Sequence, residues 1–147
     1  MKNKILTIWF LFLFSACEPS LKEGVMGWWV IDNIVYNNQD IIEFLPANSI
    51  TFENTYFSTW PGIKPNGDTC YPFELAWRES INTDGSYEIL VSGDNEIFSR
   101  KYSITFEKDT QRKCFVMKMK SDKLYIKCAK VSLFSRQDKL MNSNLVK

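Results

Sequence analysis

The chain of 147 residues contains no histidine, which excludes Ser-His-Asp and Cys-His catalysis and argues against a conventional zinc site. Its 18 basic and 17 acidic residues nearly balance, whereas a nucleic-acid-binding domain would be expected to be basic. A chain of this length is suited to one domain with its own hydrophobic core.

Residues 1–16 have the composition of a secretory signal peptide. Lys2 and Lys4 make the start basic, and the run from Ile5 to Ala16 is 12 apolar or small residues without a charge. A membrane-spanning helix needs about 20 such residues, so this run is too short to remain as a span. A basic start, a short apolar core and small residues before a cleavage point are typical of a signal that is removed.

Ser15-Ala16-Cys17 ends this segment. It resembles the lipobox of bacterial lipoproteins, with Phe14 where leucine is more common. The resemblance implies that Cys17 receives a diacylglycerol and becomes the new N-terminus, while an ordinary signal peptide with an incidental cysteine is the alternative. Residues 17–24 would then be a lipidated tether, and residues 25–147 the folded domain.

Cleavage before Cys17 would remove two lysines and no acid, leaving 16 basic and 17 acidic residues and a net charge of −1. Glu18 follows the cysteine, and under the common rule of Gram-negative lipoproteins this residue permits export to the outer membrane. We therefore expect a protein of the cell envelope that is attached to the membrane through its N-terminal lipid and does not bind nucleic acid.

Apolar and polar residues alternate with a period of two through most of the mature chain, which predicts β-strands. Turn signals such as Asn37-Asn38, Asp84-Gly85 and Ser121-Asp122 separate these runs. Several short strands with one apolar face predict an all-β fold, an antiparallel meander that closes into a barrel of roughly eight strands. A β-sandwich is the alternative.

Gly27-Trp28-Trp29 opens the first predicted strand. It resembles the G-x-W start of the lipocalin-like, or calycin, barrels, with Gly27 and Trp29 in the matching places; the alternative is that these are ordinary strand aromatics. The resemblance implies that Trp29 plugs a closed base of the barrel and that an arginine late in the chain, here Arg136, packs across it. It also implies an interior that binds a small apolar or amphipathic ligand.

Arg100 falls on the same parity as Phe98, Tyr102 and Ile104, so strict alternation would direct its side chain into the barrel. A buried guanidinium needs a carboxylate partner, from the protein or from a ligand. Arg100 and Tyr102 resemble the pair with which fatty-acid-binding calycins hold a ligand carboxylate. The alternative places Arg100 at the start of the strand, at the rim or beyond a bulge, with its charged head in water.

The loop from Ser58 to Tyr71 contains two prolines, two glycines, Trp60 and Ile63. A stiffened loop with an aromatic tip suits a barrel mouth or a contact with another protein. Trp60 could equally fold back over the core. The loop supports a second functional hypothesis, an interaction or enzyme-inhibitor lipoprotein, and a barrel completely filled by aromatic side chains would favour it. A purely structural envelope component is the third hypothesis.

The remaining cysteines are Cys70, Cys114 and Cys128, which allow at most one internal disulfide. If Ser121-Asp122 is a two-residue hairpin turn, Phe115 faces Cys128, and Cys128 points inward while Cys114 points outward. A direct bridge between Cys114 and Cys128 is therefore disfavoured; a bridge to Cys70, or a buried free thiol at Cys128, remains open.

The acidic residues offer no predicted catalytic pair. A glycosidase requires two carboxylates that converge on a substrate, but Glu74 and Glu88 have outward parity, and Glu79 and Asp84 lie at turns. We therefore expect no enzyme, no cofactor and no metal.

Overall fold

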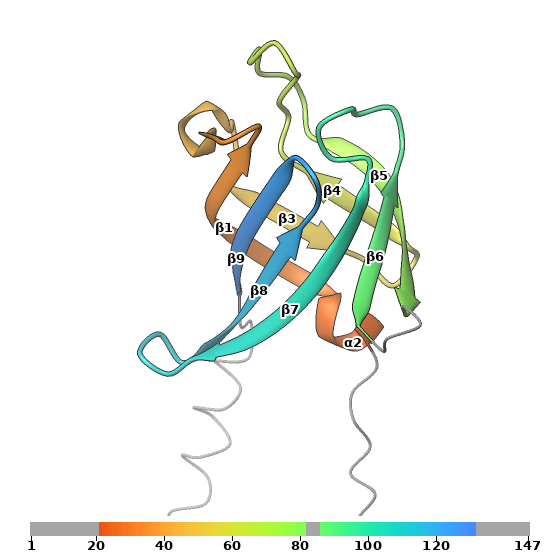
Figure 1. The fold of residues 1–147 in the computed structure, drawn as a ribbon, viewed down its shortest axis with the longest axis vertical. Coiled ribbons are helices and arrows are strands. Elements are labelled where there is room, and N and C mark those ends of the chain that lie inside the picture. The colour runs from red at the N-terminus through yellow and green to blue at the C-terminus, as the bar shows by residue number, and fades with distance from the viewer. Residues whose placement is uncertain (1–20, 82–85, 132–147) are drawn as a thin grey trace, which may run out of the picture.

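The computed structural model describes residues 21–81 and 86–131. Its strands are β1 (Gly27–Tyr36), β2 (Gln39–Asp40), β3 (Ser49–Phe52), β4 (Phe57–Trp60), β5 (Phe73–Ile81), β6 (Tyr87–Ser92), β7 (Lys101–Asp109), β8 (Cys114–Lys120) and β9 (Leu124–Lys130). From β3 to β9 each strand pairs antiparallel with the next, and β1 pairs with both β3 and β9 (Figure 1). The result is a closed antiparallel barrel of eight strands, with β2 as an extra strand beside β1. The predicted barrel is confirmed, and the β-sandwich alternative is not the fold.

The barrel has two different ends. One end, here called the base, carries the short helix α2 (Leu21–Val25) together with the starts of β1, β4, β6 and β8 (Figure 1). The opposite end, the mouth, carries β2, the 3-10 helix η2 (Ile42–Phe44), and the loops 61–72 and 93–100. The N-terminal part of the described chain therefore enters the barrel at its base.

The period-two pattern predicted most of the side chains that face the interior. In the later strands the apolar residues of one parity are buried, and they include Leu75, Trp77, Ile89, Val91, Tyr102, Ile104, Met117, Met119, Leu124, Ile126 and Cys128. Burying an aliphatic or aromatic side chain contributes roughly 1.5–3 kcal/mol, so the interior is the main source of stability. Phe106 and Phe115 share the inward parity but are 38% and 56% exposed, because this part of the β7–β8 hairpin extends past the residues of β7 that pair with β6.

The predicted register of the β8–β9 hairpin is wrong by two residues. Lys120 pairs with Tyr125, and Met117 rather than Phe115 pairs with Cys128. The Ser121 amide donates to the Leu124 carbonyl at 2.8 Å, so the two-residue turn is Asp122-Lys123, one position later than predicted. Because the shift is an even number of residues, Cys128 still points inward as predicted.

Cys70, Cys114 and Cys128 are all free thiols, so the disulfides left open by the sequence do not form between them. The Cys128 thiol is buried and donates to the Met117 carbonyl at 3.5 Å. Burial raises the pKa of this thiol well above its ordinary value of 9.0. Cys128 therefore behaves as a small apolar core residue.

Trp29 closes the base together with α2. Its side chain is fully buried, and its indole Nε1 donates to the Val25 carbonyl at 2.7 Å. Lys130 Nζ lies 5.2 Å from the centre of a Trp29 ring and donates to the Gly24 carbonyl at 3.2 Å. Gly27 has a φ of +118°, a conformation that side chains rarely adopt, which explains why glycine begins this motif.

Trp29 is buried and Trp28 is 48% exposed, so the two neighbours face opposite sides of the sheet, as alternation along a strand requires. Arg136, the residue expected to pack across Trp29, lies outside the described residues. Among the described residues Lys130 provides the cation beside the Trp29 ring.

Candidate functional site

Aromatic side chains fill the middle of the barrel. Trp60 stacks on Tyr102, with ring centres 5.9 Å apart, and lies 5.0 Å from the centre of the Phe98 ring. The Phe52 ring meets Trp60 edge-on at 5.8 Å and Trp77 at 5.4 Å. All five side chains are at most 2% exposed. These contacts link opposite walls of the barrel, so this part of the interior is packed with protein side chains.

Trp60 and Ile63 are not the exposed tip of a contact loop. Both side chains are buried. Trp60 therefore folds back over the core, which was the second of the two positions expected from the sequence. The Trp60 Nε1 donates to the Ser58 hydroxyl at 2.8 Å, and that hydroxyl donates to the Leu75 carbonyl at 2.9 Å. The predicted interaction surface therefore does not include these two side chains.

Loop 61–72 folds back on itself at the mouth. The Cys70 amide donates to the Gly62 carbonyl at 2.8 Å, and Ile63 forms an isolated bridge with Thr69. A Cβ on Gly62 would lie 1.9 Å from the Cys70 carbonyl oxygen, a distance that no side chain can accept. This glycine permits the close approach of two backbone segments, which leaves residues 64–68 projecting as the tip of the loop.

A groove of about 440 Å³ lies between this tip and the β1–β2 hairpin. Its lining residues are Tyr36, Asn37, Gln39, Ile41, Phe44, Ile63, Lys64, Pro65, Asn66, Gly67, Asp68 and Ile97. We call it the mouth groove. Its walls combine apolar side chains with amides and charges, and Phe44 on its edge is 54% exposed. The volume falls in the range of sites that bind small molecules or a few residues of a peptide.

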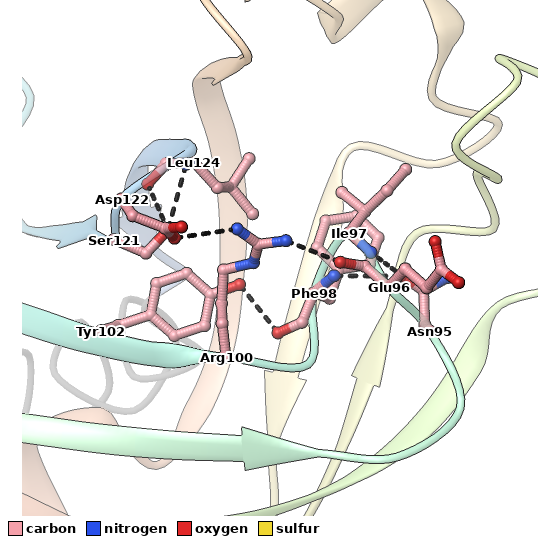
Figure 2. A network of polar contacts seen from close by, with 9 residues as sticks. All are labelled: Asn95, Glu96, Ile97, Phe98, Arg100, Tyr102, Ser121, Asp122 and Leu124. Atoms are coloured by element: carbon pink, nitrogen blue, oxygen red, sulfur yellow. Dashed lines mark hydrogen bonds and ion pairs between the residues drawn. The ribbon is translucent and has the colours of Figure 1, made fainter.

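Asn95 holds the two sides of the mouth in place. Its side-chain oxygen accepts hydrogen bonds from the amides of Ile97 and Phe98 at 2.9 and 3.0 Å, as Figure 2 shows. Its side-chain nitrogen donates to the Ile63 carbonyl at 3.2 Å, which joins loop 93–100 to loop 61–72. Asn95 is 4% exposed. In the sequence, Gly93-Asp94-Asn95 predicts only a turn, and nothing in it indicates that Asn95 links two loops.

Arg100 lies at the rim, one residue before β7, and has protein partners. Its Nη1 contacts the Asp122 carboxylate at 3.1 Å, and its Nη2 donates to the Glu96 carbonyl at 2.6 Å (Figure 2). The guanidinium carbon lies 5.8 Å from the centre of the Tyr36 ring, which lines the mouth groove. Arg100 therefore lies at the rim, but its side chain is only 14% exposed and not in water, and Asp122 of the protein provides the carboxylate partner.

Tyr102 and Arg100 have separate partners within the protein. The Tyr102 side chain is fully buried, and its hydroxyl donates to the Phe98 carbonyl at 2.8 Å. Burial raises the pKa of Tyr102 strongly, and the nearby positive charge of Arg100 offsets only part of this rise. Tyr102 therefore serves as a neutral donor within the core.

Within residues 21–81 and 86–131, no cluster of side chains is suited to hold a metal ion. In the same part of the chain, no helix has the length and apolar character needed to cross a membrane. Comparison with known proteins found no matching protein-family model, no similar curated protein and no similar solved structure.

Proposed function

We propose that this chain is a non-catalytic lipoprotein of the bacterial cell envelope that binds a segment of another protein in its mouth groove. The anchor is supported by the basic start, the short apolar run and the Ser15-Ala16-Cys17 sequence. The binding mode is supported by one observation above others: the middle of the barrel is packed with aromatic rings, while the mouth groove is open.

The chemistry of the mouth groove fits a peptide segment with an apolar side chain. Phe44 and Ile41 provide apolar contacts on one side of the groove. Asn37, Gln39 and Asn66 provide amide groups that can donate to and accept from a peptide backbone. Loops at the mouth are held by buried hydrogen bonds of Asn95, so the groove needs little reorganisation to bind.

A small apolar ligand inside the barrel, the first expectation from the sequence, stays a prediction. Such a ligand would have to displace the rings of Trp60, Phe98 and Tyr102 from one another. Its carboxylate would also have to replace Asp122 as the partner of Arg100. Both requirements make the interior a poorer binding site than the mouth groove.

Site-specific photocrosslinking in cells of the source organism tests the binding site. A photoreactive amino acid at Asn66, in the groove, should give a discrete adduct with another protein, and Phe44→Asp should abolish that adduct. The matched control is the same photoreactive residue at Arg78, which is exposed on β5 outside the groove. Equal adducts from both positions, or an Asn66 adduct that survives Phe44→Asp, would contradict binding in the mouth groove.

The anchor is tested separately by metabolic labelling. Wild-type protein should incorporate radioactive palmitate, and Cys17→Ser should not. Equal labelling of the two proteins would show that the lipobox interpretation is wrong.

A further inference from the structure

Exposed aromatic side chains gather around the base of the barrel. Four lie near the starts of β1, β4, β6 and β8, one lies on the turn before β4, and one lies in the second half of β7. In chain order they are Trp28, Tyr56, Phe57, Tyr87, Phe106 and Phe115. We call these six residues the base aromatics. Each is between 38% and 56% exposed. Of the other large apolar side chains that are exposed, Phe44 and Tyr71 both lie at the mouth.

Several base aromatics are in contact with the elements that close the base. The Phe106 ring lies 6.3 Å from Trp29, and Lys22 of α2 places its Nζ 3.9 Å from the centre of the Tyr56 ring. Tyr56 also lies 5.6 Å from Trp77. Packing against α2 and the core therefore holds the side chains of Tyr56 and Phe106 in place, although both remain partly exposed.

The proposed lipid attachment lies close to this surface along the chain. Only residues 18–20 separate Cys17 from Leu21, the first residue of α2. Even a fully extended chain covers about 3.5 Å per residue, so Leu21 can be no more than about 14 Å from Cys17. An acylated Cys17 at the membrane surface would thus keep the base within reach of the lipid headgroups.

We propose that the base aromatics dock onto the lipid bilayer, so that the barrel stands on the membrane with its mouth groove facing away from it. This inference rests on the proposed anchor at Cys17. Tyrosine and tryptophan side chains favour the membrane interface because they combine an apolar ring with a polar group. The bilayer surface is therefore the occupant whose chemistry and position both match this face.

Charged side chains of both signs lie at the base, and several of them are paired within the protein. Arg112 bonds to Asp32 and Asp109, with its closest contact to Asp32 at 2.6 Å, and Lys118 bonds to Glu107 at 2.6 Å. The base therefore presents no strong field of one sign, and docking should depend on the aromatic rings. It should occur on zwitterionic lipid and change little with salt.

Quenching by brominated lipid tests this orientation with a matched pair of variants. Tyr87→Trp adds a fluorophore at the base, and Tyr71→Trp adds one at the mouth, where the native tyrosine is 92% exposed. Each acylated protein is reconstituted into phosphatidylcholine vesicles with and without bromine on the acyl chains. We expect the brominated lipid to remove at least about half of the added Tyr87→Trp emission and almost none of the added Tyr71→Trp emission.

Equal quenching of the two added tryptophans in acylated protein would overturn the docking inference and leave the anchor intact. Absence of quenching at both positions would do the same, and would indicate that another part of the chain or a second copy covers the base. The intact mass of the same sample reports acylation. An unmodified Cys17 would overturn the anchor, and the docking inference with it.

Discussion

Truncation of Trp29 should remove a large share of the stability of the barrel. Trp29 is fully buried, and replacing such an aromatic side chain by alanine costs about 3–5 kcal/mol. The change also deprives the Val25 carbonyl of its hydrogen bond, and a buried group left unsatisfied costs about 1–3 kcal/mol. These costs overlap, so we expect a loss in the upper part of the first range, a large fraction of the 5–15 kcal/mol typical of a domain.

Urea unfolding of a chain that begins after Cys17, followed by circular dichroism, measures this loss. With a slope of about 2 kcal/mol per molar urea, a loss of 4 kcal/mol lowers the midpoint by about 2 M. Trp28→Ala is the matched control, because it removes the neighbouring tryptophan from a position that is 48% exposed. It should cost about 1 kcal/mol.

Trp29→Phe separates packing from hydrogen bonding. This variant retains an aromatic ring at the base but cannot donate to the Val25 carbonyl. Its loss should lie between those of Trp28→Ala and Trp29→Ala. Equal losses for Trp28→Ala and Trp29→Ala would refute the assignment of Trp29 as the residue that closes the base.

Three further predictions concern the core and the rim. In the native protein an alkylating reagent should modify the partly exposed Cys70 and leave the buried Cys128 unmodified until the chain unfolds. Mass spectrometry measures both rates of modification, and similar rates for the two cysteines would contradict this prediction. Because the pKa of Tyr102 is raised above its ordinary value of 10.0 in the folded state, its contribution to stability is complete below pH 10 and is lost as the pH rises further. Thermal melts above pH 10 should therefore fall more steeply for wild type than for Tyr102→Phe, and parallel curves would argue against this cause. Arg100→Leu should cost about 1–2 kcal/mol in urea unfolding, since it removes hydrogen bonds to Asp122 and a backbone carbonyl, whereas a gain in stability would indicate an uncompensated charge.

Alternation of apolar residues was sufficient to predict the barrel, because burial of one strand face fixes the parity of every side chain. It could not fix the β8–β9 register, because moving the turn by one residue shifts the pairing by two and leaves the same side chains on the same face. Parity was right that the Arg100 side chain is largely buried, because it is only 14% exposed, but it could not show that the carboxylate partner is Asp122 of the protein.

The position of Trp60 shows what local sequence signals leave out. Trp60 precedes Pro61-Gly62, which marks a loop, yet it is the last residue of β4 and lies in the core. Its burial depends on Ser58, which accepts its indole hydrogen bond from two residues away. The mouth groove likewise depends on contacts between distant segments, such as Asn95 with Ile63, which periodicity does not encode.

Native mass spectrometry of the mature protein, purified in mild detergent from its source membranes, tests the central claim most directly. We predict a chain that begins at an acylated Cys17, carries no bound fatty acid and is accompanied by a protein partner that Phe44→Asp releases. A chain that begins at another residue, or one that carries a fatty acid in place of a protein, would contradict an anchored barrel that binds proteins through its mouth groove.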